Sequence, residues 1–97
     1  MEIKIINRRG NDIKNYLSNY NFENIVLSEL EKFGYNDIIE VDYNGLSIFF
    51  KFRLNQKTKT IIISICKDLN NNYVWFVDHL NQYYQLLNEL NKIPLNI

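Results

Sequence analysis

The chain contains few of the residues that form disulfides, metal sites and phosphate-binding loops. Its 97 residues include one cysteine, one histidine, one proline, three glycines and no alanine. The single cysteine, Cys66, excludes an internal disulfide and fits a reducing compartment. The three glycines are isolated, so they form no phosphate-binding loop, and no stretch is rich in Gly, Ser or Pro. A single domain over residues 1–97 is therefore predicted, with no linker and no second module.

Neither sign of charge is in excess, because 11 basic residues balance 11 acidic ones. This balance argues against a protein drawn to nucleic acid by bulk electrostatics, and equally against an acidic DNA mimic.

Long apolar runs are missing too. The longest, residues 73–77, is far too short to span a bilayer, and the charges within residues 1–10 exclude a signal-peptide core. We expect no membrane partner and a cytoplasmic location in the producing or host cell.

Groups for catalysis and metal binding are sparse. A cysteine nucleophile needs a base within hydrogen-bond reach, and the chain offers only Cys66 and His79 for that pair. The predicted fold separates them, with Cys66 on the outer face of a strand and His79 on a helix that covers the opposite face. A structural zinc site takes several such ligands, more than the chain contains. The sequence therefore predicts no enzyme, no cofactor and no metal site.

What the sequence does contain is an alternation of apolar and polar residues on both sides of Asn44-Gly45, a dipeptide typical of a two-residue type I′ hairpin turn. That turn predicts Tyr43 opposite Leu46. A second loop, over residues 55–58, adds a third antiparallel strand. Both turns place the same apolar residues on one face of the sheet: Ile39, Val41, Tyr43, Leu46, Ile48, Phe50, Phe52, Leu54, Ile61, Ile63 and Ile65.

The other face of this sheet is predicted to be mainly charged and polar, with apolar exceptions. In the expected register Ile38, Lys51 and Ile62 form a row across the three strands, and Phe49 lies diagonally beside them. An apolar patch rimmed by charge on an exposed face is how a docking site for a protein would look. Arg53 lies on the same face and completes the predicted site there.

Apolar residues at helical spacing flank the three strands. Residues 12–33 carry such a stripe, begun by Asp12 as an N-cap and ended by Gly34, and the pattern leaves open whether they form one helix or two. Residues 73 to about 92 are predicted to form the last helix, stopped by Pro94. With a short strand near the N-terminus, the predicted fold is α+β, a three- to four-stranded, mainly antiparallel sheet with helices packed on one face.

The last predicted helix has a second apolar edge beside its buried stripe. Trp75, His79 and Leu86 share a line along this edge. Two interpretations stay open, a second binding surface or packing between the helical layers. Packing between the helical layers is the favoured interpretation. Aromatic residues make up 14% of the chain, and an excess of Tyr and Trp on a rigid scaffold is typical of interfaces, so this edge is included in the predicted site.

The order of a helix, three strands and a helix resembles that of the double-stranded-RNA-binding domain family. That family carries a lysine cluster at the start of its last helix to bind phosphates, whereas residues 71–74 read Asn-Asn-Tyr-Val at the matching positions. The resemblance therefore covers the order of elements alone. Another mode of nucleic-acid binding stays open, in which Phe49 stacks on a base and the basic residues within 51–59 attract the backbone.

A small protein-binding module without enzymatic activity is the function that we expect from the sequence. Such a module would act by occupying a partner protein's surface. Its small size and its composition, rich in the residues of AT-biased codons, suit a phage or mobile-element inhibitor of the anti-CRISPR type, or an immunity protein. A nucleic-acid-binding module that uses the open sheet face is the alternative, and a homodimer through that face is compatible with either.

Overall fold

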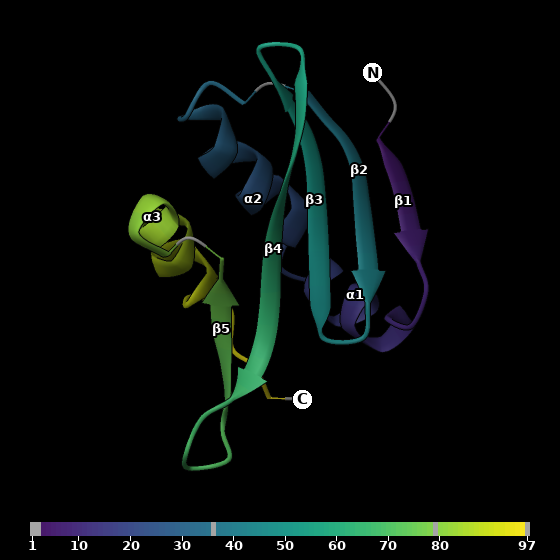
Figure 1. Ribbon diagram of the computed structural model, residues 1–97. Coiled ribbons are helices and arrows are strands. Elements are labelled where there is room, and N and C mark those ends of the chain that lie inside the picture. Colours follow the sequence, from purple (N-terminus) through teal and green to yellow (C-terminus); the bar gives the residue numbers. More distant parts are fainter. Residues whose placement is uncertain (1–2, 36, 79, 97) are drawn as a thin grey trace.

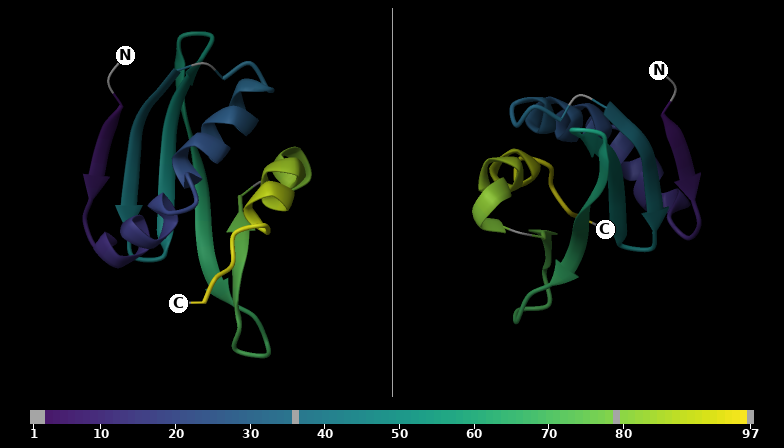
Figure 2. Two further views of the ribbon diagram at one scale, coloured as in Figure 1. Left: turned by 180° about the vertical axis from the view of Figure 1, so that it is seen from behind. Right: turned by 45° about the horizontal axis from the view of Figure 1, so that its top comes forward.

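The computed structural model describes residues 3–35, 37–78 and 80–96, which form a five-stranded mixed sheet with three helices on one face (Figures 1 and 2). The elements are β1 (Lys4–Asn7), α1 (Asn11–Ser18), α2 (Phe22–Glu31), β2 (Asp37–Asn44), β3 (Ser47–Leu54), β4 (Lys57–Lys67), β5 (Tyr73–Val77) and α3 (Leu80–Leu90). The strands lie in sequence order across the sheet, with β1 parallel to β2 and every later pair antiparallel. The predicted α+β class is confirmed, and the predicted three or four strands are too few.

The strand missed from the sequence is β5, which the helical pattern assigned to the last helix. Its residues, Tyr-Val-Trp-Phe-Val, are all β-branched or aromatic, the types favoured in strands. Just before it, the Asp68 carboxylate accepts hydrogen bonds from the backbone N–H groups of Asn70 and Asn72, both at 2.9 Å. This turn brings the chain back against β4. The helix begins only at Leu80, so the predicted helix from residue 73 is wrong over its first two turns.

The first hairpin turn lies one residue later than predicted. Gly45, with φ +64°, and Leu46 form the loop, and Asn44 still belongs to β2. A positive φ at the first loop residue alone is the pattern of a type II′ turn, not of the predicted type I′ turn. Tyr43 consequently pairs with Ile48 instead of Leu46. Because each partner moves by two positions, the two faces of β3 are as predicted.

The second hairpin turn is shorter than predicted. Asn55 and Gln56 alone form the loop, in place of residues 55–58, and Leu54 pairs with Lys57. Both loop residues have positive φ, +51° and +64°, which is the pattern of a type I′ turn built without glycine. Here too the partners move by two positions, so Ile61, Ile63 and Ile65 are buried on the predicted face.

Gln56→Gly is expected to raise the free energy of unfolding by about 0.5–1 kcal/mol, because glycine adopts positive φ without the steric cost that a Cβ brings. Urea denaturation at equilibrium measures the change. Thr58→Gly, two residues further on within β4, is the matched control and is expected to lower the same free energy by a similar amount. A destabilised Gln56→Gly variant would contradict the left-handed backbone at that position.

A β-bulge in β2 overturns the predicted position of Ile38. The register between β2 and β3 shifts between Ile38 and Glu40, so Ile39 is the additional residue. Ile38 therefore pairs with Phe52 and faces the helices, with 3% of its surface exposed. The prediction from the sequence assumes strict alternation through β2 and so places Ile38 on the outer face. This placement is wrong because the bulge turns Ile38 toward the helices.

The stripe over residues 12–33 belongs to two helices. Asn21, with left-handed backbone at φ +53°, separates α1 from α2. Gly10 is the N-cap of α1, so Asp12, predicted as the cap, lies inside the first turn. Gly34, at φ +84°, follows the end of α2 as predicted.

The helices and the inner sheet face enclose one apolar core. Phe22, at the start of α2, stacks on Trp75 of β5 with ring centroids 5.5 Å apart, and meets Phe50 of β3 edge-on at 5.7 Å. Leu90 of α3 is fully buried in the same core. The segment after α3 also contributes, because the indole N–H of Trp75 donates to the carbonyl of Ile93 at 3.3 Å. The core therefore ties β5 to elements from both ends of the chain.

Candidate binding surface on the outer sheet face

The sheet face opposite the helices faces the viewer in Figure 1. The strand registers place its side chains in rows that cross the strands. The registers place Ile6, Asp42, Phe49 and Ile62 side by side across β1 to β4. The row continues beyond β5, where the backbone N–H of Asp78 donates to the carbonyl of Ile62 at 3.1 Å. On one side of this row the outer face is charged, and on the other side it carries hydroxyl and apolar groups.

Apolar side chains gather at one end of the outer face. Phe49 and Ile62 are direct cross-strand partners and are half-buried. Val74 and Phe76 of β5 are opposite outer-face positions of β4 and are 39% and 48% exposed. We call Phe49, Ile62, Val74 and Phe76 the outer patch. Large contiguous apolar patches on an exposed face are typical of interaction sites.

The opposite end of the outer face is charged in both signs. Nζ of Lys51 lies 3.4 Å from Oε2 of Glu40, across β3 and β2. Lys4 is the partner of Glu40 on β1, and Arg53 is opposite Asp37. Exposed pairs of this kind add little to stability, so their main effect is on the electrostatic pattern of the surface. The outer patch is thus bordered by a mixed charged rim.

Asp42 is the buried acid of the outer face. Oδ2 of this carboxylate lies 3.4 Å from Nε of Arg8, and Oδ1 is buried without a hydrogen-bond partner among the described residues. Its neighbours in the row are Ile6 and Phe49, both apolar. A buried carboxylate oxygen without a partner is destabilising. Asp42 therefore has one oxygen beside Arg8 and one without a protein partner among the described residues.

The structure separates the residues predicted to form the site. Phe49, Lys51, Arg53 and Ile62 do share the outer face, whereas Ile38 lies beneath the helices because of the bulge.

The second predicted surface, a helix edge of Trp75, His79 and Leu86, is wrong. Trp75 belongs to β5 and is buried against Phe22, and Leu86 of α3 is fully buried in the core. His79 lies outside the described residues. The predicted separation of His79 from Cys66 therefore stays a prediction.

Sequence reasoning misses Val74 and Phe76 because it assigns both to a helix. The signal that identifies them is a short run of β-branched and aromatic residues directly after an asparagine-rich turn, too short for a helix. Read with a period of two, this run places Val74 and Phe76 on one face and Trp75 on the other. That reading adds two exposed residues to the outer patch.

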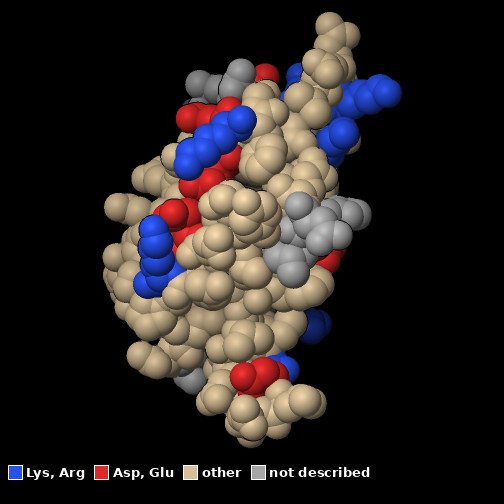
Figure 3. Space-filling model, turned by 90° about the vertical axis from the view of Figure 1, so that its left-hand side faces the viewer, with Lys and Arg blue, Asp and Glu red and all other residues tan. Residues whose placement is uncertain are grey.

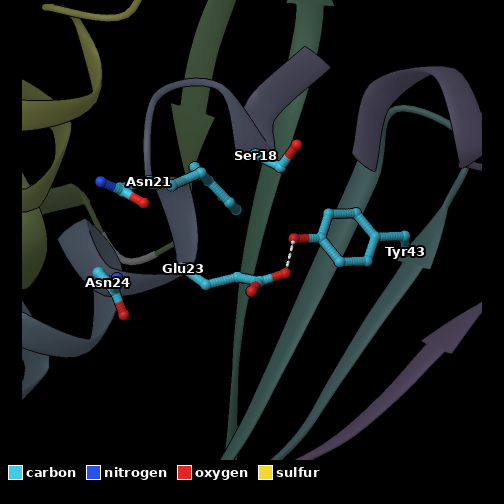
Figure 4. Close-up of a pocket in the computed structure, with 6 residues that line it drawn as sticks. Ser18, Asn21, Glu23, Asn24 and Tyr43 are labelled. Atoms are coloured by element: carbon cyan, nitrogen blue, oxygen red, sulfur yellow. Dashed lines mark hydrogen bonds between the residues drawn. The ribbon is translucent and has the colours of Figure 1, made fainter. Parts of the chain in front are cut away.

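A small cavity between α1, α2 and β2 brings a tyrosine and a carboxylate together (Figure 4). The hydroxyl of Tyr43 donates to Oε1 of Glu23 at 2.5 Å, beside Ser18 and Asn21. The cavity volume of about 120 Å³ is below the range of about 300–1,000 Å³ typical of ligand sites. Burial and the hydrogen bond to Glu23 raise the pKa of Tyr43 far above its ordinary value. A phenol that stays protonated is neither a base nor a nucleophile, so this pair fastens α2 to β2.

Tyr43→Phe is expected to lower the free energy of unfolding at neutral pH by about 1–2 kcal/mol, because it removes a hydrogen bond to a carboxylate. The raised pKa also makes stability depend on pH. The contribution of this phenol is fully present below its unfolded pKa of about 10 and is lost as the pH rises beyond that value.

Urea denaturation at about pH 8 and about pH 11 measures this dependence, and wild type is expected to lose more stability between them than Tyr43→Phe. Tyr84→Phe removes an exposed phenol and is expected to leave the pH dependence at its wild-type value. Equal losses in wild type and Tyr43→Phe would refute the assignment.

Basic side chains gather where the β3–β4 hairpin ends, at the upper end of the molecule in Figure 3. Four ion pairs join described residues, and none of them uses Arg53, Lys57 or Lys59. Lys57 and Lys59 therefore add positive charge at this end of the molecule, although the net charge of the whole chain is zero. Anions are drawn to such a region.

Groups that could perform metal or thiol chemistry are not brought together in the described part of the chain. No cluster of three or more His, Cys, Asp or Glu residues suited to a metal ion occurs there. Cys66 is exposed on the outer face, as predicted, and pairs with Val74. Among the helices described, none has the length and apolar character needed to cross a membrane.

The fold and this surface define the chain as a small α+β domain that leaves one sheet face open. Comparison of the chain with protein-family models, with curated proteins and with solved structures finds no match.

Proposed function

We propose that the protein is a non-enzymatic module that binds a partner protein through the outer patch and acts by occupying the partner's surface. The observation that carries the proposal is the position of Phe49, Ile62, Val74 and Phe76 together on the face opposite the three helices. Large apolar side chains at such a position are typical of protein interfaces. The small size of the chain and its AT-biased composition suit an inhibitor from a phage or mobile element, or an immunity protein.

The surroundings of the outer patch favour a protein as its occupant. Protein interfaces have an apolar and aromatic centre and a polar rim. The outer patch supplies the centre, and the Lys51–Glu40 pair with Arg53 and Asp37 supplies a rim of both signs. A partner with an apolar patch and alternating charges at its border is complementary to this arrangement.

Nucleic-acid binding by the same face is the second candidate, favoured by Arg53, which lies on that face and takes part in none of the ion pairs between described residues. Against it, Glu40 neutralises Lys51, and the buried Asp42 lies directly beside Phe49, where a stacked base would lie. Titration with mixed RNA and DNA at low and high salt distinguishes the two functions. We expect no tight binding, and tight, salt-sensitive binding abolished by Lys51→Glu with Arg53→Glu would replace the proposal.

The test of the proposal is capture from a lysate of the producing cells, quantified by mass spectrometry. The double variant Phe49→Asp with Phe76→Asp is expected to lose a specific captured protein at least about tenfold, which corresponds to about 1.4 kcal/mol. Leu69→Asp is the matched control, because Leu69 is fully exposed in the turn between β4 and β5 and is not one of the outer-patch residues. It is expected to capture the protein as wild type does.

Circular dichroism establishes that both variants are folded. Equal capture by the double variant and by wild type would exclude the outer patch.

Sedimentation equilibrium is expected to show a monomer. A dimer that the double variant dissociates would assign the face to self-assembly and would overturn the proposal.

A further inference from the structure

A pocket opens on the inner side of the sheet, near the end where the β3–β4 hairpin projects. Its volume is about 320 Å³, within the range of about 300–1,000 Å³ typical of small-molecule sites. Its lining includes Tyr35, Phe52, Lys59, Ile61, Gln82 and Tyr83. Phe52 and Ile61 are buried residues of the inner face, so the pocket is separate from the outer patch.

The rings around this pocket are held in place by their packing. Tyr35 and Tyr83 are each 4% exposed. The ring of Tyr35 lies 4.4 Å from that of Phe52, and Phe33 meets Tyr83 edge-on at 5.5 Å between centroids. The two phenol hydroxyls are therefore positioned before any ligand binds, which lowers the entropy cost of binding.

The hydrogen bonds of the pocket leave a donor unused. The hydroxyls of Tyr35 and Tyr83 lie 3.3 Å apart, and Nε2 of Gln82 donates to the Tyr35 oxygen at 3.4 Å. Only one of the two phenolic protons lies between the two oxygens, and the other has no acceptor among the described residues. Burial, followed by the hydrogen bond to Tyr35, raises the pKa of Tyr83, which therefore keeps its proton at neutral pH. The pocket thus presents a spare O–H donor.

Lys59 adds positive charge at the same place. Its side chain is exposed, takes part in none of the ion pairs between described residues, and has no acidic side chain beside it in the pocket lining. A positioned O–H donor, a free ammonium group and apolar walls together suit a carboxylate attached to an apolar body.

We propose that this pocket binds a small organic carboxylate. Its charged end lies toward Lys59 and the tyrosine hydroxyls, and its apolar body lies on Phe52 and Ile61. This site would be the second on the molecule. If benzoate does not bind in this pocket, the proposal for the outer patch is unaffected, because the two sites share no residue.

Benzoate is the probe, and benzamide, which has the same shape without the charge, is its match. In NMR titrations of the ¹⁵N-labelled chain, benzoate is expected to shift the amides of residues 59–61 and 82–83 saturably. It is expected to bind at least about tenfold more tightly than benzamide. Lys59→Gln and Tyr83→Phe are each expected to weaken benzoate binding several-fold. Lys57→Gln, which removes the same charge from the same hairpin outside the pocket, is expected to leave it unchanged.

Three results would overturn this assignment. Benzamide that binds as tightly as benzoate would show an apolar cavity without anion recognition. Equal losses from Lys59→Gln and Lys57→Gln would show general attraction to the basic hairpin. A linear, non-saturating response to benzoate would show that no site is present. As a folding control, the NMR spectrum of Lys59→Gln is expected to match that of wild type away from the pocket.

Discussion

Phe22→Ala is expected to lower the free energy of unfolding by about 3–5 kcal/mol, the usual cost of truncating a large buried aromatic side chain. Phe22 is 1% exposed and lies between the rings of Trp75 on β5 and Phe50 on β3. Its removal leaves a cavity where α2, β3 and β5 meet. Because a domain has only about 5–15 kcal/mol of stability, this variant is expected to be close to unfolding at room temperature.

Phe76→Ala is the matched control, since it deletes the same side chain from the exposed side of β5. Its expected cost is at most about 0.5–1 kcal/mol. Urea denaturation followed by circular dichroism measures both variants. Equal costs would contradict the assignment of residues 73–77 to a strand with Trp75 inside and Phe76 outside, because a helix would bury Phe76 in its main stripe.

Ile38→Asp is expected to cost more than about 4 kcal/mol or to prevent folding, because it places a carboxylate in the core without a partner. Ile38 is 3% exposed and is the cross-strand partner of Phe52. Phe49→Asp makes a comparable change on the half-buried outer face and is expected to cost no more than about 1–2 kcal/mol. Thermal and urea denaturation compare the two. A folded Ile38→Asp variant as stable as Phe49→Asp would show that β2 has no bulge and that Ile38 faces outward.

The faces of β3 and β4 could be predicted because they depend on a local period of two. Each turn was misplaced, but partners that move by two positions keep their side chains on the same face. Gly34 could be predicted as a helix end because the left-handed conformation there favours glycine. These features depend on residues that are neighbours in the sequence.

The features that escaped prediction depend on contacts between distant segments. The bulge at Ile39 leaves no local signature, because Ile38 and Ile39 are both isoleucine and either could face the core. Residues 73–77 fit both a helical and a strand period, and the packing of Trp75 against Phe22 favours the strand. Of the residues predicted for the site, Ile38 and Trp75 lie in the core, whereas Phe49 and Ile62 lie on the outer face. Val74 and Phe76, which are exposed on that face, are absent from the prediction.

The outer sheet face is the surface that we propose for a partner protein. Cys66 offers a direct test, because it is the chain's only cysteine, is exposed on that face and is opposite Val74 in the outer patch. A benzophenone maleimide attached to Cys66 is irradiated in a lysate of the producing cells. The control is Ser28→Cys with Cys66→Ser, which moves the same probe to an exposed position on α2.

We expect one protein to be crosslinked from Cys66 and not from position 28. An excess of unlabelled wild type is expected to suppress that crosslink, and the variant Phe49→Asp with Phe76→Asp is expected to leave it intact. Equal crosslinking from both positions, or equal competition by wild type and the double variant, would contradict the account.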